Sequence, residues 1–145
     1  MNGTLVKFGY PASLIKDYDH WCVLLRPQQV TLASLVLAAK SEATAFGSLP
    51  AGAHAELATV TADIERHLHR TFAYDRINYL MLMMVDPHVH MHVLPRYQEP
   101  RTFDGHAFSD PGWPGPPDLK TFADVPQVTR ASLLWTLQQR FSGEQ

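Results

Sequence analysis

The chain has 145 residues, of which 46% are hydrophobic and 18% charged, with a formal net charge of −2 and one cysteine. This composition fits a single ordinary core and excludes a disordered chain, a coiled coil and the basic surface of a nucleic-acid-binding protein. The longest apolar run, residues 79–85, is too short to span a bilayer, and the first residues lack the layout of a secretory signal. One cysteine cannot form an internal disulfide, so we expect a cytoplasmic protein without a membrane partner.

The first part of the chain reads as short strands. Leu14–Asp17 and Trp21–Leu25 are predicted strands separated by a polar turn, and the apolar run Leu32–Ala39 is predicted to be a buried strand. Between Pro50 and Arg70, apolar residues recur at spacings of three and four. That spacing predicts a long amphipathic helix.

Two further strands are predicted after the long helix, at Arg76–Val85 and His88–Arg96. They are joined by Asp86-Pro87, which is too short for a crossover helix, so the strands should pair antiparallel. A last helix is expected at Pro126–Phe141. Strands with segregated helices indicate an α+β fold, here an antiparallel sheet of about five strands with one long helix and a C-terminal helix.

A proline-rich segment, residues 108–119, lies between the last predicted strand and the last predicted helix. Trp113 within it favours a docked loop over a free linker, because a large aromatic side chain gains stability by packing. We expect this loop to pack over the sheet or across a dimer interface. Residues 1–145 are accordingly interpreted as one domain, with a C-terminal helix at about 126–141.

Three histidines alternate with apolar residues in the run His88-Val89-His90-Met91-His92. On a strand, residues at i, i+2 and i+4 share one face, so the three imidazoles should line one face while the apolar side chains face the core. A row of imidazoles suits an elongated polyanion such as a phosphate ester or anhydride. A neutral imidazole is a good nucleophile near neutral pH because its pKa is about 6.5, and its attack would form a covalent intermediate on nitrogen.

A metal site is an alternative interpretation of the same row, because imidazole is a common metal ligand. His88 and His92 would lie about 13 Å apart along a strand, so at most two adjacent histidines, such as His88 and His90, could share one ion. The sequence offers no partner motif for further ligands. The expected site therefore contains no metal.

The run from His88 to Arg96, His-Val-His-Met-His-Val-Leu-Pro-Arg, resembles the signature of the histidine-triad (HIT) superfamily. The order of the buried strand, the long helix and the histidine strand is also similar to that family, so the resemblance implies a HIT core at about residues 12–97. The resemblance implies a nucleotidyl hydrolase or transferase that needs no cofactor and forms homodimers. It implies that His90 attacks the α-phosphorus, that His88 orients His90 through its backbone carbonyl, and that His92 contacts the phosphate.

The chain departs from the family pattern at three places. The segment before the histidine strand, residues 83–87, lacks the glutamine that many members place there as a donor to the scissile or leaving oxygen. Ser34 stands where a fourth histidine is common, and Arg26 aligns near the residue that holds the ribose hydroxyls. Gln28 and Asn78 are the nearest amides that could take over the ribose contact. Arg26 could instead favour an additional phosphate or carboxylate on the substrate.

The sequence therefore predicts a hydrolase of a nucleotide phosphoanhydride or phosphoramidate, similar to nucleoside phosphoramidases and dinucleoside polyphosphate hydrolases, with catalytic residues His88, His90 and His92. Arg26, Gln28, Ser34 and Asn78 are the candidate substrate-binding residues. Two alternatives stay open. One is a nucleotide-binding protein of the same fold with little turnover, and the other is a metal-binding module that uses His88 and His90.

Overall fold

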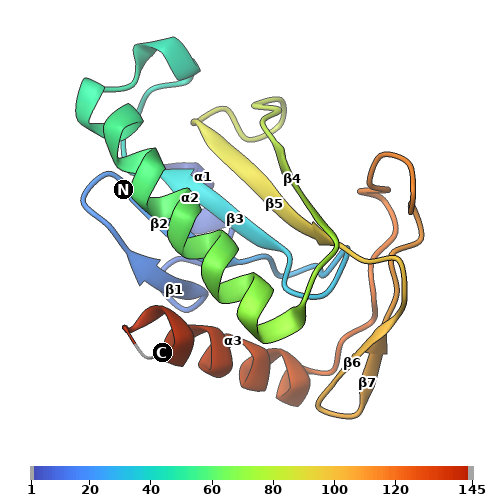
Figure 1. The fold of residues 1–145 in the computed structure, drawn as a ribbon. Coiled ribbons are helices and arrows are strands. Elements are labelled where there is room, and N and C mark those ends of the chain that lie inside the picture. The colour runs from blue at the N-terminus through green and yellow to red at the C-terminus, as the bar shows by residue number, and fades with distance from the viewer. Residues whose placement is uncertain (1, 144–145) are drawn as a thin grey trace.

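A five-stranded antiparallel sheet organises the computed structural model, which describes residues 2–143 (Figure 1). The strands lie in the order β1-β2-β3-β5-β4. Their bounds are β1 Leu14–Asp17, β2 Trp21–Leu25, β3 Leu35–Ala39, β4 Arg76–Leu80 and β5 His90–Arg96. The helices are α1 Gly3–Lys7, α2 Ala51–Phe72 and α3 Gln127–Phe141, with a 3₁₀ turn at Phe46–Ser48. A separate hairpin pairs β6 Arg101–Phe103 with β7 His106–Phe108. The predicted α+β fold is confirmed.

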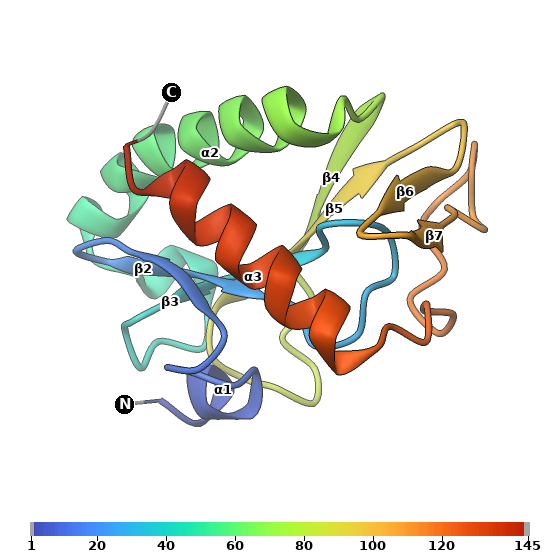
Figure 2. The same ribbon diagram turned by 90° about the horizontal axis from the view of Figure 1, so that it is seen from below.

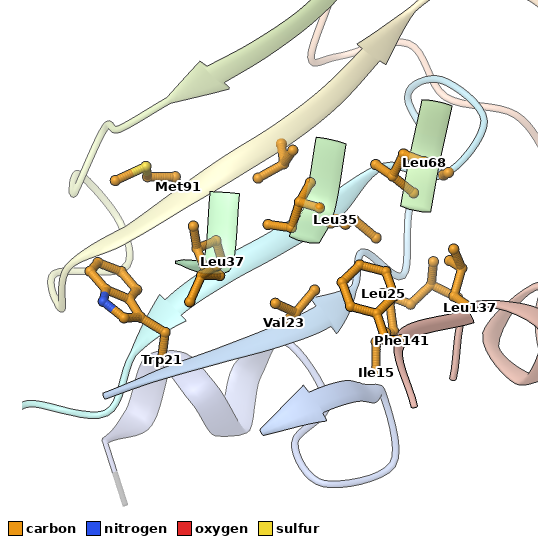
Figure 3. Packing of buried hydrophobic residues seen from close by; sticks show 14 of the residues in the cluster. Ile15, Trp21, Val23, Leu25, Leu35, Leu37, Leu68, Met91, Leu137 and Phe141 are labelled. Atoms are coloured by element: carbon orange, nitrogen blue, oxygen red, sulfur yellow. The ribbon is translucent and has the colours of Figure 1, made fainter. Parts of the chain in front are cut away.

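The two faces of the sheet are covered by different helices, with α1 on one side and α2 on the other (Figure 2). On the α2 side, alternate residues of β2, β3 and β5, such as Val23, Leu35 and Met91, pack with Leu68 of α2 and Leu137 of α3 (Figure 3). On the α1 side, the other residues of β2 and β3 form a smaller cluster with α1. Its members are Leu5, Phe8, Cys22, Leu24, Val36 and Ala38. Because both faces are covered, β2 and β3 are buried throughout.

The register places the histidines on the α1 side of the sheet. His90 pairs with Ala38 and His92 pairs with Val36, and both partners belong to the cluster packed against α1. Val89, Met91 and Val93 belong to the large core beneath α2. The predicted alternation of imidazole and core side chains is therefore confirmed for His90 and His92, while His88 precedes the strand.

The predicted strand ends differ from the observed ones around the histidine row. β4 ends at Leu80 instead of Val85, and β5 begins at His90 instead of His88. The intervening residues 81–89 form a longer loop. Met84 and Val85 in this loop are exposed, so the apolar composition that predicted a strand does not correspond to packing on the sheet here. β3 likewise begins at Leu35, because Ala33 has a left-handed backbone, with φ of 66°, and interrupts the extended chain.

Helix α1 and the β6–β7 hairpin were not predicted. Helix α1 begins after Asn2, whose side-chain oxygen accepts a hydrogen bond from the Leu5 amide and so caps the helix. The β6–β7 hairpin turns at Asp104-Gly105, where both residues have positive φ angles of 54° and 76°. Two successive left-handed residues with this sequence are typical of a tight hairpin turn.

The proline-rich loop is docked, as its tryptophan predicted, and an ion pair at the end of β5 holds it. Arg96 and Asp110 form this pair at 2.7 Å with side chains only 4% and 1% exposed. Arg96 also donates a hydrogen bond to the Gly115 carbonyl at 3.0 Å. Trp113 is half-buried beside these residues. In the part of the chain that the structure describes, no helix is long and apolar enough to cross a membrane.

Candidate active site

His90 is the first residue of β5, and its imidazole is held in one orientation. The residue is 2% exposed, and its Nδ1 atom lies 2.7 Å from the backbone carbonyl oxygen of His88. A carbonyl oxygen can only accept a hydrogen bond, so Nδ1 of the neutral ring carries the proton. The lone pair is then on Nε2, which is the tautomer that a nitrogen nucleophile requires.

His92 lies beside His90 and stays neutral near neutral pH. The two ring centroids are 5.1 Å apart, and the Phe8 ring lies 5.7 Å from each of them. Burial, followed by the positive charge of Arg26, lowers the pKa of His92 to about 4. Arg26 donates from Nε to Nδ1 of His92 at 3.4 Å, so the proton of this ring lies on Nε2. That N–H can donate to a phosphate oxygen.

His88 lies just before β5, and its side chain is engaged in structural contacts. Nδ1 is 3.1 Å from the Thr4 hydroxyl in α1, and Nε2 is 3.2 Å from a carboxylate oxygen of Glu42 in the loop after β3. The imidazole thus joins α1 to the loop after β3. The backbone carbonyl of His88 is the group that reaches His90, as the resemblance implied.

A small pocket opens next to His92, at the end of β2. Its volume is about 220 Å³, and it is lined by Lys7, Phe8, Arg26, Pro27 and Gln28. Arg26 is half-buried and donates from Nη1 to the Gln28 carbonyl at 2.6 Å. The side chain of Gln28 is exposed at the rim. The structure therefore brings two of the four predicted binding residues, Arg26 and Gln28, to the histidine row.

The other two predicted binding residues have different surroundings. Ser34 is fully buried, and its hydroxyl donates to the Thr31 carbonyl at 2.7 Å within the turn before β3. Asn78 accepts a hydrogen bond from Arg96 at 2.8 Å and lines a cavity of about 410 Å³ beside Trp113. The Ser34 hydroxyl and the Asn78 amide thus stabilise local structure in this conformation.

Sequence reasoning missed the contribution of α1 and its flanking residue. Lys7 and Phe8 line the pocket, and Thr4 contacts His88. The spacing of Leu5 and Phe8 by three residues is the signal that could have identified a short amphipathic helix here. Nothing in that spacing shows that the helix would cover the histidines.

Gln29, also missed, shapes the loop that carries Arg26. It is fully buried, accepts hydrogen bonds from the Ala33 and Ser34 amides, and donates to the carbonyls of Arg26 and Ser34. One side chain therefore makes hydrogen bonds to four backbone groups around this turn. This network fixes the backbone from which Arg26 reaches His92.

Comparisons with known proteins identify the family. The family model of the HIT domain matches residues 10–99, which include β1 to β5. The chain belongs to the HIT domain family. A comparison with curated proteins found no match. Among solved structures, the HIT-family fold is shared by a histidine triad protein from Bradyrhizobium japonicum, with a TM-score of 0.74 and 17% identity over 97% of this chain and 96% of that one.

Two further solved structures share the HIT fold. A histidine triad protein from Marinobacter aquaeolei has a TM-score of 0.72 and 21% identity over 89% of this chain and 88% of that one. A zinc-bound histidine triad family protein from Mycobacterium smegmatis has a TM-score of 0.61 and 19% identity over 97% of this chain and 94% of that one. In residues 2–143 of the present HIT protein, no group of three or more His, Cys, Asp or Glu side chains is arranged to hold a metal ion.

Proposed function

We propose that this HIT protein is a hydrolase that forms a covalent nucleotidyl intermediate on His90, with a nucleotide phosphoramidate or phosphoanhydride as substrate. The observation that carries the proposal is the 2.7 Å contact between Nδ1 of His90 and the His88 carbonyl oxygen, because it leaves Nε2 free to attack. Membership of the HIT family supports a nucleotide-like substrate.

In the proposed reaction, the Nε2 lone pair of His90 attacks the α-phosphorus and a P–N bond forms. The bond from phosphorus to the leaving group breaks, and that group departs with the bonding electron pair. When the leaving group is an amine, it also takes a proton from solvent. His92, held neutral with its proton on Nε2, donates to a phosphate oxygen as negative charge develops there. Water then attacks phosphorus, breaks the P–N bond and regenerates the imidazole, releasing a nucleoside monophosphate and a proton.

The test is mass spectrometry of the intact protein after brief incubation with adenosine and guanosine phosphoramidates and dinucleoside polyphosphates. We expect a nucleotidyl mass increment on the wild type and none on His90→Ala. The matched control is His54→Ala, because His54 is an exposed histidine on α2. Circular dichroism establishes that each variant is folded. A folded wild type that gives neither adduct nor product with any compound would contradict the proposal.

A nucleotide-binding protein with little turnover is the second candidate. It is favoured by the loop between β4 and β5, which presents exposed Leu82, Met84 and Val85 where a hydrogen-bond donor to the leaving group would be useful. This candidate predicts that nucleotides bind, as measured by calorimetry, without an adduct on His90.

We also propose that the reaction requires no metal or cofactor. Both ring nitrogens of His88 already have partners, Thr4 and Glu42, so His88 and His90 do not form a ready chelate in this conformation. Adduct formation should therefore be unchanged by EDTA. Loss of adduct with EDTA and recovery with zinc would favour the metal alternative.

The last proposal concerns assembly. β4 is an edge strand of the sheet, and pairing it with β4 of a second copy would join the two sheets. Light scattering during gel filtration should give a mass of about twice the 16.3 kDa of the chain. A monomer at micromolar concentration would contradict the dimer.

A further inference from the structure

Arg26, a half-buried cation beside the histidine row, has no counter-ion within residues 2–143. Among residues 2–143, the ion pairs engage other basic side chains. These are Lys7, Lys40, Arg66, His88, Arg96 and Arg101. The guanidinium of Arg26 instead donates to an imidazole nitrogen and a backbone carbonyl, neither of which carries a negative charge. Burial lowers the pKa of Arg26, which reflects the cost of taking this charge out of water.

The pocket next to Arg26 has room for a further group of a ligand. Its volume of about 220 Å³ is several times the volume that one molecule occupies in liquid water, about 30 Å³. Phe8 and Pro27 supply apolar walls, and the other basic residue, Lys7, is already paired with Asp86 at 3.0 Å. Arg26 is thus the cation of this pocket that lacks an ionic partner in the described residues, and it lies in contact with His92.

We infer that Arg26 selects substrates that carry a second anionic group, a phosphate or a carboxylate, in addition to the phosphate that faces the histidines. A guanidinium forms charge-assisted and often bidentate hydrogen bonds with these planar or tetrahedral anions. An anion in this pocket supplies the missing counter-charge while the first phosphate lies against His90 and His92. The inference rests on the proposed function and makes Arg26 a specificity-determining residue for it.

A purely structural role for Arg26 makes a different prediction. In that case Arg26 only holds the Gln28 carbonyl and His92, so replacing it would weaken all nucleotides alike. The informative quantity is therefore the ratio of affinities for nucleotides with and without a second anion, and not the affinity for any one nucleotide.

Titration calorimetry with adenosine 5′-monophosphate, adenosine 5′-diphosphate and adenosine 3′,5′-bisphosphate measures this ratio. We expect one of the two doubly phosphorylated nucleotides to bind at least about tenfold more tightly than the monophosphate. A hydrogen bond to a charged group contributes about that much to affinity. Preference for the 3′,5′-bisphosphate places the second anion on the ribose, and preference for the diphosphate places it on the phosphate chain.

Substitutions of Arg26 test whether this residue causes the difference in affinity between nucleotides with and without a second anion. Arg26→Gln should bring the ratio close to one, and Arg26→Lys, which keeps the charge but not the planar fork, should keep part of it. Arg70→Gln is the matched control, because Arg70 is an exposed arginine of α2 and its loss changes the net charge equally. The wild-type preference should also weaken as the salt concentration rises.

An unchanged ratio in folded Arg26→Gln overturns the inference, as does a wild type that binds all three nucleotides equally. The inference and the proposed function fail separately. If His90 gains an adduct but no second anion improves binding, the inference is wrong and the proposed chemistry stands. If the ratio depends on Arg26 but no adduct forms with any compound, the proposed chemistry is wrong and the inference stands.

Discussion

The neutral state of His92 should make the stability of the protein depend on pH in a defined window. The imidazole titrates near 6.5 in the unfolded chain, whereas burial, followed by the charge of Arg26, lowers its pKa to about 4 in the folded protein. Between these values the unfolded chain binds more protons, so acid favours unfolding. The stability linked to neutral His92 is complete above the unfolded pKa and is lost as the pH falls towards the folded one.

The gap between the two pKa values corresponds to about 3 kcal/mol in total, of which about 2 kcal/mol should be lost between about pH 7 and about pH 5. Urea denaturation of the wild type and of His92→Gln at several pH values measures this loss. His67, whose pKa burial also lowers, is present in both proteins and cancels in the difference. His54→Gln, an exposed histidine, serves as the control. A difference between wild type and His92→Gln that does not change with pH would refute the reasoning.

Three further predictions concern the docked loop, the end of α2 and the histidine row. Asp110→Asn should cost about 3–5 kcal/mol of unfolding free energy in urea, because it breaks a buried ion pair, whereas the exposed Asp118→Asn should cost little. A loss below about 1 kcal/mol would show that the loop does not depend on the pair. Ala73→Gly should raise stability by about 1 kcal/mol, because Ala73 caps α2 with a left-handed φ of 52° and is exposed; a lower melting temperature would contradict this. His88→Ala should slow adduct formation on His90 by less than about tenfold in quenched-flow mass spectrometry, because the backbone carbonyl of His88 is the group that contacts the His90 ring. Complete loss of the adduct in this variant would show that the His88 side chain is needed.

Local sequence patterns were sufficient for much of the sheet and for the orientation of its histidines. β1 and β2 have the predicted bounds, and the long helix α2 begins and ends within a few residues of the prediction. The alternation of His90 and His92 with Met91 placed the imidazoles on the opposite face from the core, because side chains on a strand alternate whatever the strand pairs with. The local signal was weakest at residues 81–85, where apolar composition predicted strand and the chain forms a loop.

The surroundings of the histidines depended on contacts between distant parts of the chain. Thr4 and His88 are 84 residues apart and Arg26 and His92 are 66 residues apart, yet each pair is in contact. A linear pattern assigns a side chain to a face of its own element, but the neighbour on that face comes from another element whose position is set by packing. The sequence by itself therefore determined the row of imidazoles and the nucleophile proposed in it. Only the tertiary structure decided that α1 covers the row and that Arg26 adjoins it, because burial and hydrogen bonding arise once separate elements pack together.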